Sequence, residues 1–183
     1  MPRVYLVRHG RASAGWDTDP DPDLDDLGRH QAGKMADLLA PLGPLELVSS
    51  PLRRCQSTAA VLGARWDRQA VIEPAVAEIP SPEGVPMGQR VEWLRNAMSG
   101  TWTALGLRYT QFRDGIGQYL AAVPTDTVIA SHFVAINAAI GLATSSDAVL
   151  IRSLDNCSVT VMDVADGTLR LVEGGHEADT LIR

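Results

Sequence analysis

The chain has 183 residues, a formal net charge of −6 and 45% hydrophobic residues. At this length we expect one domain over residues 1–183, with a core that is stable without disulfides or a metal. The acidic balance argues against general nucleic-acid binding, because a phosphate backbone attracts a basic surface. No apolar stretch approaches the roughly 18 residues of a membrane span, and the first residues do not resemble a secretory signal. We therefore expect a cytoplasmic protein with no membrane partner.

The first part of the chain alternates strand-like and helical patterns. The apolar run Val4–Val7 is typical of a buried parallel strand. A loop rich in Asp and Pro follows over 16–28, and apolar residues at helical spacing predict a helix over 29–42. We expect a second strand over 45–50, a second helix over 51–66 and a short third strand over 70–74.

The second part continues this alternation and ends differently. A segment rich in Pro and Gly, 78–88, leads to helices over 90–98 and 103–122. A strand over 126–131 precedes an apolar helix over 132–142, and the runs around Asp166-Gly167 predict a β-hairpin. The pattern predicts an α/β fold, a three-layer α/β/α sandwich with a mostly parallel sheet and an antiparallel edge strand.

Basic side chains follow three of the expected strands. They are Arg8 and His9 after the first strand, Arg53 and Arg54 after the second, and His132 after the fourth. Because ligands bind outside the carboxyl ends of parallel strands, we expect these residues to converge at one edge of the sheet. Such a cluster repels itself unless an anion neutralises it, and arginine side chains and helix N-termini suit a tetrahedral oxyanion. The sequence therefore predicts a phosphate pocket.

Three sequence blocks occur in an order and spacing that match a known family over nearly the whole chain. The blocks are LVRHGRAS, SSPLRRCQSTA and VIASH. Together they resemble the histidine phosphatase superfamily, whose fold is also called phosphoglycerate mutase-like.

The resemblance implies a role for each basic residue. His9 would be the nucleophile that takes the phosphoryl group, and Arg8 and Arg54 would bind the phosphate oxygens. His132 would be the second histidine of the pocket, donating to the phosphoryl oxygens. Arg53 is expected to face outward, because adjacent helical residues point about 100° apart.

The resemblance also implies an acidic proton donor after the third strand. Here this is Glu78, with Glu83 as the competing candidate. A neutral imidazole is a good nucleophile at neutral pH, and the leaving alkoxide needs a proton. Since two arginines and a histidine supply the positive charge, and no residues have metal-ligand spacing, we expect neither a metal nor another cofactor.

Two positions depart from the family pattern. Ala12 and Gly15 stand where many members carry a Ser or Thr and an Asn near the phosphate, and the segment from Glu83 to Thr110 is shorter than the substrate-binding insert of the mutases. We therefore expect a metal-independent phosphomonoester hydrolase that acts through phosphohistidine on a small phosphorylated metabolite or a phosphoprotein. The alternatives are a phosphoglycerate-type mutase and a non-catalytic phosphate- or protein-binding module on the same fold.

Substrate specificity is expected to depend on residues 11–26 and 79–113. Trp16, Trp93 and Trp102 lie in these segments, where single tryptophans are more often part of the core than of a pocket. Asn156 is a further, weaker candidate for the pocket. Cys55 and Cys157 are expected to be buried free thiols.

Overall fold

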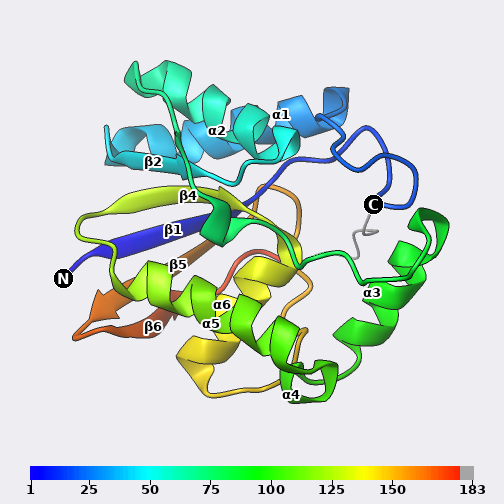
Figure 1. Ribbon diagram of the computed structural model, residues 1–183. Helices are drawn as coiled ribbons and strands as arrows, with labels where there is room; N and C mark the ends of the chain where they lie inside the picture. Colours follow the sequence, from blue (N-terminus) through cyan, green and yellow to red (C-terminus); the bar gives the residue numbers. More distant parts are fainter. Residues whose placement is uncertain (178–183) are drawn as a thin grey trace.

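A six-stranded sheet forms the centre of the molecule, with the strand order β3-β2-β4-β1-β5-β6 (Figure 1). The computed structural model describes residues 1–177. The strands are β1 (Arg3–Arg8), β2 (Glu46–Ser49), β3 (Val71–Ile72), β4 (Thr127–Ser131), β5 (Val159–Ala165) and β6 (Thr168–Glu173). The first four pair in parallel, while β5 is antiparallel to β1 and β6 is antiparallel to β5. The expected mostly parallel sheet with an antiparallel edge is confirmed, and that edge is the two-stranded hairpin β5–β6.

Helices cover both faces of this sheet. They are α1 (Asp26–Leu39), α2 (Arg53–Trp66), α3 (Arg90–Met98), α4 (Trp102–Leu105), α5 (Leu107–Ala121) and α6 (Phe133–Thr144), with short 3-10 turns at Ala40–Leu42, Pro74–Val76 and Met87–Gln89. Helices α1 and α2 lie on one face, and α5 and α6 lie on the other (Figure 1). Of the helices in residues 1–177, none is long and apolar enough to cross a membrane.

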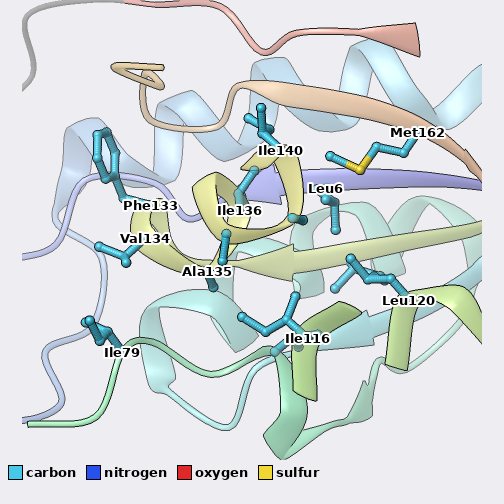
Figure 2. Packing of buried hydrophobic residues seen from close by; sticks show 14 of the residues in the cluster. Leu6, Ile79, Ile116, Leu120, Phe133, Val134, Ala135, Ile136, Ile140 and Met162 are labelled. Carbon is cyan, nitrogen blue, oxygen red and sulfur yellow. The ribbon is translucent and has the colours of Figure 1, made fainter. Parts of the chain in front are cut away.

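The core explains why β4 and α6 hold their positions. Every residue of β4 is buried, and its side chains alternate between the two apolar clusters, with Val128 on the α1–α2 side and Ile129 on the other. Helix α6 is apolar on all sides and is buried over its first nine residues. Ile136 on α6 packs in one cluster with Leu6 of β1 and Leu120 of α5 (Figure 2). The junction between β4 and α6 is thereby fixed deep in the molecule.

Several element boundaries differ from the sequence expectation for local reasons. Helix α1 begins at Asp26 and not at Arg29, because the Asp25 side chain accepts the Gly28 amide at 2.7 Å and caps the helix. Helix α2 begins at Arg53 and not at Pro51. Pro51 and Leu52 therefore precede the helix.

Two other expected elements are longer than the elements in the structure. The strand expected over 70–74 is reduced to Val71–Ile72, which forms an exposed edge. The helix expected over 103–122 is divided at Gly106, whose φ of 99° interrupts the helical backbone between α4 and α5.

Candidate active site

The basic residues that follow β1, β2 and β4 meet at one edge of the sheet. Arg8 is opposite Ser131 in the β1–β4 register, so the next residues, His9 and His132, emerge side by side with ring centroids 5.3 Å apart. Arg54, at the start of α2, lies within 3.2 Å of a ring nitrogen of each histidine. The expected convergence is confirmed.

A pocket opens at this edge. Its lining residues are Arg8, His9, Arg11, Ala12, Trp16, Arg54, Glu78, Leu94, Phe133 and Asn156. His132 is completely buried and is not among them; it contacts the pocket through Arg54. Its direct contact with phosphoryl oxygens, expected from the family resemblance, stays a prediction.

The hydrogen bonds of His9 define its protonation. Its Nδ1 is 2.7 Å from the Gly10 carbonyl oxygen, which only accepts, so Nδ1 carries the hydrogen and donates it. The unprotonated Nε2 then accepts from Arg54 Nε at 3.2 Å. Burial, followed by the charges of Arg54 and Arg8, holds the pKa of His9 well below its ordinary value. The ring is therefore neutral, with its lone pair on the nitrogen that faces the guanidinium of Arg54.

His132 has the opposite tautomer. Arg54 Nη2 can only donate, so His132 Nδ1 accepts from it at 3.2 Å. The Nε2 hydrogen is then donated to the Ser50 hydroxyl oxygen at 2.7 Å. Burial and then the Arg54 charge lower the pKa of His132 well below its ordinary value. Ser50, which the sequence did not single out as a functional residue, fixes the orientation of this ring.

The two pocket arginines are buried and aimed at the same space. Arg8 donates from Nη1 to the Leu154 carbonyl at 2.7 Å and lies over the Phe133 ring, 5.0 Å from its centroid. Burial lowers the pKa of Arg8 to about 10. Arg54 Nη1 is buried and has no hydrogen-bond partner among residues 1–177. Since buried donors are nearly always paired, Arg54 Nη1 is a candidate donor to an anion.

Glu78 reaches the pocket from the loop after the 3-10 turn Pro74–Val76. Its carboxylate accepts from the amides of Ile79 at 3.0 Å, Ala135 at 3.2 Å and Val134 at 3.4 Å, the last two at the N-terminus of α6. Burial raises the pKa of Glu78, and these amides only partly oppose that effect. A carboxyl group with a raised pKa beside a phosphate pocket is suited to donating a proton.

Glu83, the competing acid, lies elsewhere. Its side chain is 92% exposed and is 3.5 Å from Arg108. It does not line the pocket. The geometry therefore favours Glu78 over Glu83 as the candidate donor.

A loop and helix α2 support the backbone at His9 and Gly10. Asn156 lines the pocket and donates from Nδ2 to the His9 carbonyl oxygen at 3.2 Å. The Gly10 amide donates to Thr58 Oγ1 at 3.0 Å, and a Cβ on Gly10 would lie 2.5 Å from the Gly28 carbonyl oxygen. A glycine is thus required where the loop after β1 crosses the start of α1.

Three other residues from the sequence analysis lie in different environments. The Arg53 side chain is 60% exposed and lies 3.5 Å from Asp23, so it faces outward as expected. Trp102 is completely buried in the core, whereas Trp16 lines the pocket.

Both cysteines are free, as expected. Cys55 is completely buried, Cys157 is only partly so, and burial raises the pKa of Cys157 to about 12. Within residues 1–177, no three His, Cys, Asp or Glu side chains gather into a group that could hold a metal.

Comparison with known proteins identifies the family. Residues 4–175 match the model of the histidine phosphatase superfamily (branch 1). A glucosyl-3-phosphoglycerate phosphatase of Mycolicibacterium vanbaalenii is 40% identical over 80 residues, which cover 42% of this chain and 36% of that relative. The chain thus aligns with only about a third of that curated relative's length.

Solved structures show the same fold over almost the full chain. The structure named mycobacterial hydrolase 1 has a TM-score of 0.75 at 23% identity and covers 97% of this chain and 100% of its own. A phosphoserine phosphatase from Entamoeba histolytica in complex with 3-phosphoglyceric acid has a TM-score of 0.76 at 20% identity and covers 98% of each chain. On the family match across residues 4–175, this chain belongs to the histidine phosphatase superfamily (branch 1).

Proposed function

We propose that the chain is a phosphomonoester hydrolase that acts through a phosphohistidine on His9. One observation carries this proposal: the unprotonated Nε2 of His9 and the unpartnered Nη1 of Arg54 belong to the same pocket. The first is a nucleophile, and the second is a donor with no acceptor among the described residues. A phosphoryl group in the pocket supplies both an electrophile and an acceptor.

The first half-reaction follows from these positions. The dianionic phosphate binds to Arg8 and Arg54, and Arg54 Nε exchanges His9 Nε2 for a phosphoryl oxygen. The Nε2 lone pair attacks phosphorus in line with the ester oxygen, so the N–P bond forms as the P–O bond breaks. The leaving alkoxide takes the proton of Glu78, which becomes a carboxylate.

The second half-reaction restores the enzyme. The carboxylate of Glu78 takes a proton from a water molecule, whose oxygen attacks phosphorus from the side that the alcohol left. The N–P bond breaks, its electron pair returns to Nε2, and inorganic phosphate leaves. His9 stays oriented throughout, because Nδ1–H remains bonded to the Gly10 carbonyl.

The relatives suggest the substrate class. One is named for glucosyl-3-phosphoglycerate, and another was solved with 3-phosphoglyceric acid. We therefore propose a small phosphorylated metabolite as substrate. The two free cysteines suit a reducing compartment, which supports our proposal of a cytoplasmic location.

A single experiment tests the covalent step. Brief reaction with a ³²P-labelled aryl phosphate, quenched without acid, should trap a phosphoenzyme that is labile to acid and stable to base. The variant His9→Ala should form none and should lose turnover by several orders of magnitude while keeping its thermal unfolding transition. Normal turnover by that folded variant would rule out the proposal.

A further inference from the structure

The pocket has an apolar wall beyond the phosphate-binding residues. Ala12, Trp16 and Leu94 line it, in the same pocket as Arg8 and Arg54. We call these three residues the leaving-group wall, because in-line attack by His9 places the ester oxygen of a bound phosphate on the side away from His9, in the rest of the pocket. The wall comes from two segments far apart in sequence, the loop after β1 and helix α3.

The loop that carries Trp16 is held in place by its own backbone. Ser13 donates to the Asp23 carbonyl at 2.8 Å, and Asp25 donates to the Arg11 carbonyl at 3.0 Å. These bonds join the two ends of the loop like the strands of a hairpin. Next to Trp16, the Gly15 carbonyl accepts two further backbone amides at 3.1 Å each. Trp16 is therefore positioned before any ligand binds.

A second tryptophan supports the first. Trp93 of α3 packs against Trp16, with ring centroids 6.4 Å apart and planes inclined by 59°. Tyr109 of α5 packs against Trp93, with ring centroids 5.4 Å apart. In Figure 1 the loop after β1 and helix α3 lie at the same end of the molecule, beyond the carboxyl ends of the parallel strands. Trp16 lines the pocket and Trp93 does not, so Trp93 holds Trp16 from outside it.

We propose, on the basis of the proposed function, that the alcohol part of the substrate carries an aromatic ring that packs against Trp16. Aromatic pairs gain attraction beyond the area they bury, and a rigid indole offers a large flat surface for such a pair. A sugar ring also has a flat face, but its hydroxyl groups need hydrogen-bond partners when buried. The wall offers them only the Trp16 Nε1 hydrogen, because the side chains of Ala12 and Leu94 are apolar.

Phosphonates test this subsite without turnover, because their P–C bond is not hydrolysed. Dissociation constants of methylphosphonate, benzylphosphonate and cyclohexylmethylphosphonate should be measured by calorimetry. The last two share a carbon skeleton and differ in the planarity of the ring. The protein should bind benzylphosphonate roughly three- to tenfold more tightly than cyclohexylmethylphosphonate, the ratio that an aromatic pair contributes.

Variants assign the preference to one residue. Trp16→Leu should bind both ring compounds equally, while Trp16→Phe should keep part of the preference. Trp66→Phe is the matched control: Trp66 ends α2 and packs with the cluster on the other face of the sheet, so its variant should keep the full ratio.

The outcomes separate this inference from the proposed function. If methylphosphonate fails to bind the wild-type protein, the phosphate pocket itself is wrong. If methylphosphonate binds but the two ring compounds bind equally, or Trp16→Leu and Trp16→Phe both keep the full ratio, the aromatic subsite is refuted and the proposed function stands. Loss of methylphosphonate binding in Trp16→Leu with the full ratio kept in Trp16→Phe supports the subsite and shows that the loop needs an aromatic ring.

Discussion

Arg54 donates its Nε–H to the Nε2 of His9 across 3.2 Å, so the resting pocket occupies the lone pair that the proposed reaction uses. The same arginine donates from Nη2 to His132, and its Nη1 has no partner among the described residues. Burial and then the charge of Arg54 keep both rings neutral, and Arg54 keeps one donor for a ligand. In the proposed reaction, a bound phosphate accepts from Nη1 and competes for Nε, which frees His9 to attack.

Arg54→Ala should lower kcat/KM by an amount equivalent to about 2–5 kcal/mol, the cost of removing one partner of a buried charge pair. The control is the neighbouring Arg53→Ala, which removes an exposed side chain paired with Asp23 and should change kcat/KM little. Steady-state kinetics of both variants with the same aryl phosphate measures the two losses in kcat/KM. A larger loss in Arg53→Ala would contradict the placement of Arg54 in the pocket.

Glu78→Gln should slow hydrolysis of an alkyl phosphate by roughly 10²–10⁴-fold, because the alkoxide then leaves without a proton. An aryl phosphate should be affected much less, since a phenolate is a good leaving group without protonation. Glu83→Gln removes an exposed acid and should leave both rates nearly unchanged. Equal slowing of both substrates by Glu78→Gln would mean that Glu78 only shapes the pocket.

Ser50→Ala should impair activity through His132. Its hydroxyl accepts the Nε2 hydrogen of His132 at 2.7 Å, so the variant leaves a buried donor unpaired, at a cost of about 1–3 kcal/mol in unfolding free energy. The ring also loses the bond that fixes its orientation, and kcat should fall and change its pH profile. Ser49→Ala is the control: Ser49 is equally buried, but its hydroxyl donates to the Ser50 carbonyl and does not contact His132. An unchanged pH profile in Ser50→Ala would show that Ser50 is merely structural.

Acid should destabilise the fold through two histidines. His9 and His132 have pKa values well below 6.5 when folded, owing to burial and then to the charge of Arg54. Below pH 6.5 the unfolded chain therefore binds protons that the folded chain does not, so the unfolding free energy decreases as pH falls. Each histidine contributes a slope of up to about 1.4 kcal/mol per pH unit.

Urea unfolding between pH 7 and pH 5 measures this slope. His9→Gln should reduce the slope of unfolding free energy against pH by the contribution of one histidine. His30→Gln changes an exposed position on α1 and should leave this slope unchanged. A slope that is the same in His9→Gln and in the wild type would contradict this prediction, because it would show that His9 binds protons equally in the folded and the unfolded chain.

Catalysis should not depend on a metal, because the guanidinium groups of Arg8 and Arg54 supply the positive charge around the phosphoryl group. A chelator such as EDTA should therefore leave the rate unchanged. Vanadate should inhibit strongly, because its trigonal-bipyramidal form matches the transition state of phosphoryl transfer. Loss of activity in EDTA that a divalent ion restores would contradict this prediction.

The sequence alone determined the elements and the composition of the phosphate end of the pocket. Hydrophobic periodicity is local, so it predicted the alternation of strands and helices, and parallel strands bring their carboxyl ends to one edge. Arg8, His9, Arg54 and His132 follow three such strands directly, and this is why their meeting could be predicted from chain position. Periodicity did not predict the start of α1, since the cap at Asp25 is a single side-chain contact.

Only the tertiary structure decided what lies around this phosphate end. Glu78 and Glu83 are five residues apart in one loop, and packing against the N-terminus of α6 brings only Glu78 to the pocket. The sequence does not distinguish Trp16 from Trp102 as a pocket residue. In the fold, Trp16 packs against Trp93 and lines the pocket, whereas Trp102 is buried in the core. Loops have no periodicity that fixes where their side chains point, so their positions depend on contacts with residues far away in the chain.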